Sequence, residues 1–247
     1  MTLVGVSLKM YLSAAATRTW LTEVRSVVGR ATGAPEMFVL PTFPLLESAA
    51  RLLGGGDIAW GAQDIAAADD GAQTGEVGGA VLAELGCSYV AVGHAERRAH
   101  FGEDDTTVAA KAAAAVRHGL TPVVCVGEPD RVGAAAAVRF CRSQLDPVLD
   151  ACARSPVVVA YEPVWAINAA EPAPPAHIRA VADGVRPLLA SRDARLIYGG
   201  SAGPGLFAEL DRSVDGLFLG RFAHDPAALE TVIGQMTVTS QQRGVER

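Results

Sequence analysis

Short runs of β-branched and other apolar residues alternate with longer alanine-rich, amphipathic stretches along the whole chain of 247 residues. Parallel strands joined by helical crossovers produce this alternation. Eight such units are present. The predicted strands cover residues 4–8, 37–40, 57–62, 89–92, 121–126, 157–161, 195–198 and 216–219. The predicted helices cover residues 14–30, 43–53, 78–85, 104–118, 131–153, 176–190, 203–210 and 226–234.

This count predicts an α/β fold, a (β/α)8 barrel formed by one domain over residues 1–247. Eight strands and eight helices in about 250 residues is the usual size of such a barrel. The competing fold is a doubly wound open sheet, which normally carries a G-x-G-x-x-G turn after its first strand. The sequence at that point is Ser7-Leu8-Lys9-Met10-Tyr11, which favours the barrel.

Composition excludes several classes of protein. The formal net charge is −6, which argues against binding to nucleic-acid phosphates. No apolar run reaches the roughly 20 residues that span a bilayer, and the first residues lack the pattern of a signal peptide, so we expect a cytoplasmic protein with no membrane partner. The four cysteines form no C-x-x-C pair, and we expect them to be reduced, with no metal site and no cofactor.

Polar residues collect directly after the predicted strands. In a (β/α)8 barrel the carboxyl ends of all strands meet at one face, and chemistry is found there. The residues that follow these strand ends are Lys9, Gln63, His94 with Glu96, Arg97 and Arg98, Glu162, the turn Gly199-Gly200-Ser201, and Gly220 with Arg221. We therefore expect them to converge on one site.

Each of three candidate catalytic residues has a structural alternative. Lys9 is one of two lysines among 21 basic residues, which favours a functional role over a solvated strand cap, whereas Lys111 is expected to be an ordinary helix charge. His94 is suited to donate to a substrate carbonyl, or it is a histidine satisfied at the core edge. Glu162 ends an apolar strand and is a general base, or it pairs with an arginine.

Together these residues fit proton abstraction beside the carbonyl of a phosphorylated sugar. Glu162 would remove the proton, and Lys9 and His94 would stabilise the enediolate oxygens. The backbone N–H groups of the turns at Gly200 and Gly220 are suited to bind phosphate, which commonly lies at loops seven and eight of this fold.

Several collinear segments carry a resemblance to a known family. They are residues 61–64 (GAQD), 74–76 (TGE), 92–98 (VGHAERR), 101–103 (FGE), 119–128 (GLTPVVCVGE), 160–167 (AYEPVWAI) and 198–201 (YGGS). Over nearly its whole length the chain resembles the triosephosphate isomerase family. The resemblance implies that Lys9 polarises the substrate, His94 is the electrophile and Glu162 the base, with Glu96 beside the lysine and Ser201 in the phosphate loop.

The resemblance also implies a lid over residues 165–175 and a homodimer. The loop with Thr74, Gly75 and Glu76 is similar to the segment through which the family dimerises, close to the partner's active site. A lid of this kind excludes water from the reactive intermediate.

The chain departs from the family around the substrate. Ser7 stands where the family has asparagine and Ala95 where it has serine, and the lid tip reads Asn168-Ala169-Ala170-Glu171 in place of Gly-Thr-Gly-Lys. Asn168 can still adopt a positive φ. Arg221 replaces the second glycine of a Gly-Gly pair, where it binds phosphate with two N–H groups or points to solvent.

These departures leave three functions open. The first substrate class is a triose phosphate, dihydroxyacetone phosphate or glyceraldehyde 3-phosphate, and the second is a tetrulose phosphate such as L-erythrulose 1-phosphate. The third alternative is a non-catalytic barrel that acts as a binding module.

Overall fold

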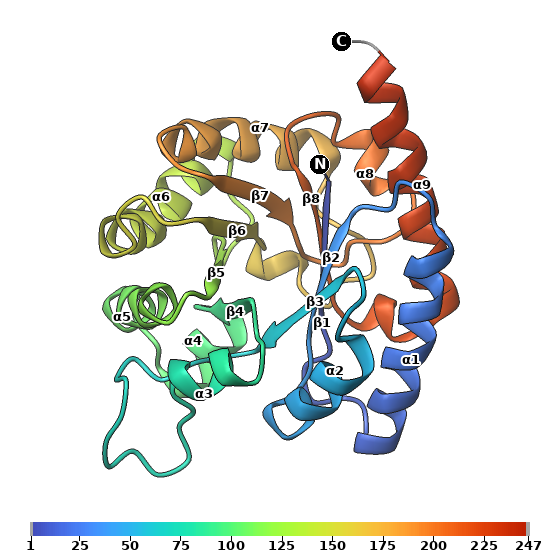
Figure 1. The fold of residues 1–247 in the computed structure, drawn as a ribbon. Helices are drawn as coiled ribbons and strands as arrows, with labels where there is room; N and C mark the ends of the chain where they lie inside the picture. The colour runs from blue at the N-terminus through green and yellow to red at the C-terminus, as the bar shows by residue number, and fades with distance from the viewer. Residues whose placement is uncertain (1, 246–247) are drawn as a thin grey trace.

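Eight parallel strands form a closed barrel in the computed structural model, which describes residues 2–245 (Figure 1). The register that closes it pairs the first strand with the eighth, with Leu3 opposite Gly216. The (β/α)8 prediction is confirmed, and each strand begins and ends within one residue of its predicted bounds. The strands are β1 (Leu3–Ser7), β2 (Glu36–Leu40), β3 (Ile58–Ala62), β4 (Tyr89–Val92), β5 (Thr121–Val126), β6 (Val157–Tyr161), β7 (Ala194–Tyr198) and β8 (Gly216–Leu219).

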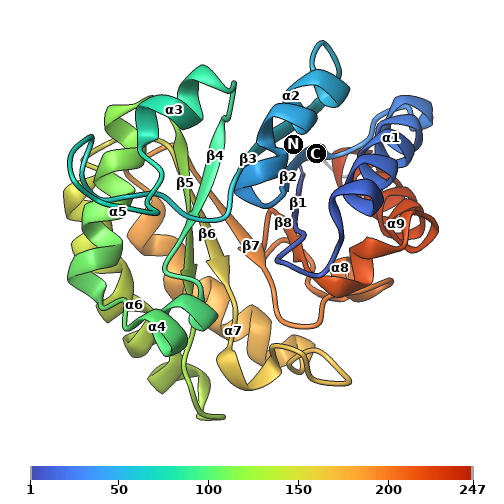
Figure 2. The ribbon, with the colours of Figure 1, turned by 90° about the horizontal axis from the view of Figure 1, so that it is seen from below.

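Helices surround the strands in both views (Figures 1 and 2). The α-helices are α1 (Ala14–Arg30), α2 (Leu46–Leu53), α3 (Gly79–Glu84), α4 (Ala95–Phe101), α5 (Asp105–Arg117), α6 (Ala134–Ala151), α7 (Pro175–Val185), α8 (Leu206–Glu209) and α9 (Pro226–Val245). Short 3-10 helices are η1 (Phe43–Leu45), η2 (Val164–Ala166), η3 (Arg186–Leu189) and η4 (Arg221–His224).

Several helices differ from the sequence-based expectation. The predicted helices over residues 43–53 and 176–190 are each divided into an α-helix and a 3-10 helix, and α6 begins three residues later than predicted. Helix α4 was not predicted, because its seven residues follow directly on His94 and bury no side chain. Helix α8 is shorter than predicted, at four residues, and α9 continues beyond the predicted end at residue 234.

The strands are buried on both faces, as a closed parallel barrel requires. In β1 the side chains of Val4 and Val6 pack outward beneath the helices, and Leu3 packs inside the barrel. Gly5 also faces inward, where the rings of Phe38 and Phe218 occupy the space that a Cβ atom would need. Ser7 follows on the same inward face, since alternate residues of a strand share a face.

All four cysteines are free and buried, in agreement with the expectation of reduced thiols. Burial raises the pKa of the Cys87 thiol to about 11 and that of Cys141 to about 12. Over the described residues, no helix combines the length and apolar character needed to cross a membrane.

Candidate active site

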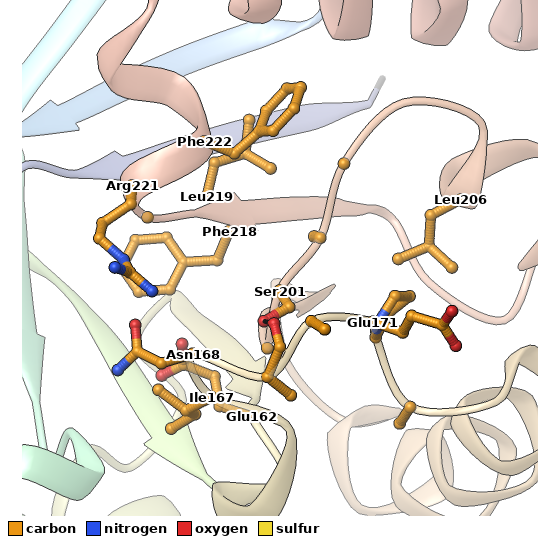
Figure 3. Close-up of a pocket in the computed structure, with 18 of the residues that line it drawn as sticks. Glu162, Ile167, Asn168, Glu171, Ser201, Leu206, Phe218, Leu219, Arg221 and Phe222 are labelled. Carbon is orange, nitrogen blue, oxygen red and sulfur yellow. Dashed lines mark hydrogen bonds between the residues drawn. The ribbon is translucent and has the colours of Figure 1, made fainter.

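A cavity of about 930 Å³ opens at the carboxyl ends of the strands. It is lined by nearly all of the expected site residues, namely Ser7, Lys9, His94, Glu162, Asn168, Gly200, Ser201, Gly220 and Arg221. Figure 3 shows the half of this cavity formed by the lid and by the loops after β7 and β8. Five distant parts of the chain, those after β1, β4, β6, β7 and β8, therefore contribute to one site.

Glu162 is the first residue after β6, and its carboxylate is buried next to His94. Its Oε2 atom lies 3.7 Å from His94 Nε2. Within the described part of the chain this oxygen is buried and has no hydrogen-bond partner, and no arginine pairs with the carboxylate. Removing a carboxylate from water without a full set of partners is costly, so this group is held ready for a ligand rather than for a structural ion pair.

Gly199 provides the space for this carboxylate. A Cβ atom at position 199 would lie 2.5 Å from Glu162 Oε1. The sequence-based interpretation placed this glycine in the phosphate turn, and the structure corrects it, because Gly199 lies against Glu162 and does not line the cavity, whereas Gly200 and Ser201 do.

Cys125, on β5, is a neighbour of Glu162 that the sequence did not indicate. Burial raises the pKa of its thiol well above the usual value, and the adjacent Glu162 carboxylate, which accepts a hydrogen bond from it, raises it further. The thiol therefore stays protonated and acts as a donor to the carboxylate.

His94 caps helix α4, and this contact fixes its tautomer. The Glu96 backbone N–H donates to His94 Nδ1 over 3.1 Å. Because Nδ1 accepts this hydrogen bond, the ring proton is on Nε2, the nitrogen that faces Glu162 and the cavity. The imidazole is thus presented as a neutral hydrogen-bond donor.

Lys9 follows β1 in a left-handed backbone conformation, with φ of 48°. Its ammonium group donates to Glu96 Oε1 over 2.5 Å, and the Gln63 side chain donates to its backbone carbonyl over 3.0 Å. Burial alone would raise the pKa of Glu96, but the Lys9 hydrogen bond and the nearby charges hold it below its usual value. A non-glycine residue in this conformation stores strain, which is common at functional sites.

Beneath α4 lies a buried network of four charges. Lys111 Nζ donates to Asp64 Oδ1 and Oδ2, both at 2.8 Å, and to Glu103 Oε1 at 2.6 Å. Arg97, within α4, bonds the same two carboxylates at 2.8 and 2.6 Å. The expectation that Lys111 is an ordinary helix charge is wrong, because its side chain is buried and joins α5 to Asp64 after β3 and to Glu103 between α4 and α5.

The lid is held at both ends by buried polar groups. At its first end Trp165 Nε1 donates to Glu128 Oε1 over 2.9 Å, and Tyr161 donates to the same carboxylate over 3.1 Å. At its far end the Ala173 N–H donates to the Tyr198 hydroxyl over 3.1 Å, and this hydroxyl donates to Gly200 O over 2.9 Å.

The lid tip lies over the cavity. Ser201 Oγ donates to Ala169 O over 2.8 Å, which joins the tip to the loop after β7. Asn168 has φ of 59°, so the prediction that it adopts a positive φ is confirmed. In Figure 3 Glu171 points away from Arg221, while Arg221 points toward Asn168. The carboxylate of the tip is therefore directed away from the cationic side of the cavity.

The opposite side of the cavity is electropositive. The Arg221 guanidinium lies 5.9 Å from the centre of the Tyr11 ring. Burial, and then the charges of Arg221 and Lys9, lower the pKa of His224, which follows on η4. Ser201, which has φ of 54°, and Gly220 line the cavity between these cations and the lid. This arrangement suits an anionic group.

Further expected residues lie outside the cavity. Gln63, Arg97 and Arg98 do not line it, although Gln63 supports the backbone of Lys9. Glu96 contributes through Lys9 and His94, without lining the cavity itself. Thr74, Gly75 and Glu76 are exposed in the long loop between β3 and α3, which projects from the barrel in Figure 1. In residues 2–245 no three His, Cys, Asp or Glu side chains are grouped so that they could hold a metal ion.

Residues 2–236 match the family model described as triosephosphate isomerase. The chain is 44% identical to the L-erythrulose-1-phosphate isomerase of Pectobacterium atrosepticum, over 96% of both chains. It is 43% identical to the triosephosphate isomerase of Cupriavidus necator and 38% identical to that of Thermus thermophilus, in each case over 84% of this chain and 87% of the relative.

Proposed function

The chain belongs to the triosephosphate isomerase family and is a sugar-phosphate isomerase, and we propose that it interconverts L-erythrulose 1-phosphate and D-erythrulose 4-phosphate. The observation that carries the proposal is the lid-covered cavity, which has a carboxylate, a neutral imidazole and an ammonium group at one end and an electropositive turn at the other. The four-carbon substrate is preferred because the similarity to the erythrulose phosphate isomerase extends over 96% of both chains.

Glu162 is the base in this proposal. Its carboxylate takes the proton from carbon 3 of L-erythrulose 1-phosphate, and the electron pair of the C–H bond moves into the C2–C3 bond while the C2 carbonyl becomes an enediolate oxygen. Glu162 then returns its proton to carbon 2, the proton of the carbon-3 hydroxyl passes to the oxygen on carbon 2, and the carbonyl forms at carbon 3. The Oε2 atom, which has no partner among the described residues, is suited to receive this proton.

His94 and Lys9 stabilise the enediolate. The His94 Nε2–H group donates to the oxygens on carbons 2 and 3, and the Lys9 ammonium offsets the negative charge that develops on them. Both donors are held in place before substrate binds, by the Glu96 backbone N–H and the Glu96 carboxylate respectively. Such fixed donors contribute strongly to rate because they need no reorganisation during the reaction.

The phosphate group occupies the electropositive end. Its ligands are the backbone N–H groups near Asn168, Gly200, Ser201 and Gly220, together with the Arg221 guanidinium, which forms two parallel hydrogen bonds to phosphate. Closure of the lid by Tyr198 and Ser201 keeps water from the enediolate. No cofactor enters this mechanism.

Triose phosphates are the second candidate substrates. Lys9, His94 and Glu162 would act on dihydroxyacetone phosphate in the same way, and two triosephosphate isomerases are about as similar in identity as the erythrulose phosphate isomerase, at 43% and 38% against 44%. Dihydroxyacetone phosphate differs from L-erythrulose 1-phosphate by lacking the terminal hydroxymethyl group.

The test is a comparison of kcat/KM for four substrates with one enzyme preparation. They are L-erythrulose 1-phosphate, D-erythrulose 4-phosphate, dihydroxyacetone phosphate and glyceraldehyde 3-phosphate. We expect the tetrulose pair to be turned over with kcat/KM at least ten times that of the triose pair. Faster turnover of the trioses would refute the tetrulose assignment and support the second candidate.

We also propose that two copies of the chain associate through the loop after β3. Thr74, Gly75 and Glu76 are exposed at its tip, and Met10 and Phe101, which follow β1 and β4, are large apolar side chains left 90% and 68% exposed. Light scattering coupled to gel filtration should give twice the monomer mass, and Thr74→Arg should shift the mass toward the monomer. A monomeric wild-type protein at micromolar concentration would contradict the proposal.

A further inference from the structure

His177 connects the two ends of the lid, although it does not line the cavity. It lies in the first turn of α7, directly after the far end of the lid, and its backbone N–H group donates to Pro174 O over 2.8 Å. Its ring packs edge-on against Trp165, at the first end of the lid, with the ring centres 5.7 Å apart. The two ends of the lid are therefore in contact with each other.

The side chain of His177 also reaches the polar groups that hold Trp165. His177 Nε2 lies 3.2 Å from the Tyr161 hydroxyl oxygen and 3.3 Å from Glu128 Oε1. The same Glu128 oxygen accepts from Trp165 and from Tyr161. We call Glu128, Tyr161, Trp165 and His177 the hinge cluster. It joins the segment after β5, the end of β6, the 3-10 helix η2 and α7.

The direction of these hydrogen bonds follows from the number of protons available. Burial, and then the charge of Glu128, keep the pKa of Tyr161 far above its usual value, so the phenol retains its one proton and donates it to Glu128. The Tyr161 oxygen can then only accept from His177, and the Glu128 carboxylate is an acceptor as well. His177 Nε2 therefore carries a proton, which it shares between these two acceptors.

This donor supports the closed position of the lid. Trp165 belongs to the lid, so a lifting lid moves its indole N–H away from Glu128 Oε1. The position of that oxygen is set by Tyr161 and His177, which do not belong to the lid. Glu128 is 1% exposed, so loss of the His177 donor leaves a buried acceptor with fewer partners.

We infer that His177 is a positioning residue that fixes the hinge cluster, so that the lid returns to one closed position and stays there during the reaction. The inference rests on the lid and the enediolate of the proposed function, and it is independent of the length of the substrate. Lid residues that act in this way affect how long the intermediate is protected rather than the proton transfer itself.

Loss of phosphate from the enediolate measures this protection. In both candidate substrates the phosphate is on the carbon next to the enediolate. In the enediolate of L-erythrulose 1-phosphate, the C2–C3 electron pair can move into the C1–C2 bond while the bond from carbon 1 to the phosphate oxygen breaks. The oxygen on carbon 3 becomes a carbonyl as its hydroxyl loses a proton, and inorganic phosphate leaves. A lid that opens too soon increases this side reaction relative to isomerisation.

The experiment measures inorganic phosphate released per isomerisation, together with kcat/KM, in wild type, His177→Phe and His177→Gln. The substrate is whichever of the four above the wild type converts fastest. Phenylalanine keeps a ring against Trp165 and removes the donor, so kcat/KM should fall about 5-fold and the phosphate ratio should rise about 5-fold, as expected for loss of one hydrogen bond. Glutamine restores an N–H donor and should bring both values to within about 2-fold of wild type.

The control is Ala180→Phe, which adds the same ring on the exposed face of α7 and should leave both values unchanged. The phosphate ratio comes from one sample, so it is independent of the fraction of folded enzyme. If His177→Phe does not fold, His177→Asn, whose amide is too short to reach Tyr161, takes its place. An unchanged phosphate ratio in these variants, or a glutamine variant as defective as phenylalanine, would overturn the role of His177. A wild-type enzyme that converts none of the four substrates would instead refute the proposed function.

Discussion

Replacing Lys111 by methionine should destabilise the protein by about 3 kcal/mol. Lys111 has three short hydrogen bonds to the carboxylates of Asp64 and Glu103, and all three side chains are at most 8% exposed. Removing one partner of a buried ion pair costs about 3–5 kcal/mol, because the other charges remain buried. We take the lower end of this range since Arg97 still contacts both carboxylates.

Urea denaturation and thermal melting measure this effect. A loss of about 3 kcal/mol lowers Tm by roughly 6–12 °C in a chain of this size. The control is Arg142→Met, which removes an exposed pair with Asp146 and should change the free energy of unfolding by at most about 0.5 kcal/mol. A loss below about 1 kcal/mol for Lys111→Met would show that the network is not stabilising.

The pH dependence adds a second condition. Burial raises the pKa of Glu103, but hydrogen bonds from Lys111 and Arg97 outweigh burial and hold that pKa below its usual value. The ionised Glu103 side chain therefore stabilises the wild-type fold above the pKa that Glu103 has in the unfolded chain, and this stabilisation is lost as the pH falls through its pKa in the folded protein. Without Lys111, burial raises the pKa of both carboxylates, as it already does for Asp64 in the wild type, and the variant gains stability as they take up protons. The difference between the two proteins should therefore shrink between pH 7 and about pH 4. A constant difference would contradict the role assigned to these charges.

Three further substitutions test the site. Glu162→Gln should lower kcat about 1,000-fold with little change in KM, because it removes the base and keeps the shape, and steady-state kinetics that show a loss below 10-fold would rule Glu162 out as the base. Arg221→Gly should raise the inhibition constant of inorganic phosphate about 10-fold, as expected for loss of a charge-assisted hydrogen bond, and an unchanged constant would mean that Arg221 points to solvent. Tyr198→Phe removes the hydroxyl that joins Ala173 to Gly200, so kcat/KM should fall about 5- to 30-fold and proteolysis within residues 167–174 should become faster; equal cleavage rates would argue against a lid held by Tyr198.

The strands could be predicted closely because each one is a short apolar run bounded by turn residues, and burial on both faces leaves little freedom in where it begins. The carboxyl ends of the strands also mark the candidate site, so position alone predicts Lys9, His94 and Glu162 as candidate catalytic residues. The loop after β4 was harder. Helix α4 has no apolar stripe, since it buries no side chain, and it is fixed instead by the His94 cap and the Arg97 ion pairs.

Contacts between distant residues account for the other differences. Lys111 is surrounded in the sequence by alanine, and nothing nearby shows that Asp64 and Glu103 are brought to it by the barrel. Gly199 follows a strand like any turn glycine, and only the position of Glu162 across β6 and β7 shows why a side chain is excluded. Both are consequences of packing, which periodicity and motif spacing do not encode.

The hydrogen bond that sets the His94 tautomer comes from the main chain, and this has a consequence for mutational tolerance. Nineteen of the twenty standard residues would supply the same N–H group at position 96, and proline would not. Substitutions of Glu96 therefore alter the pairing of Lys9 but leave the imidazole proton on the nitrogen that faces Glu162 and the cavity. Substitutions near His94 therefore leave its ring proton on Nε2 unless they change the path of the backbone at residue 96.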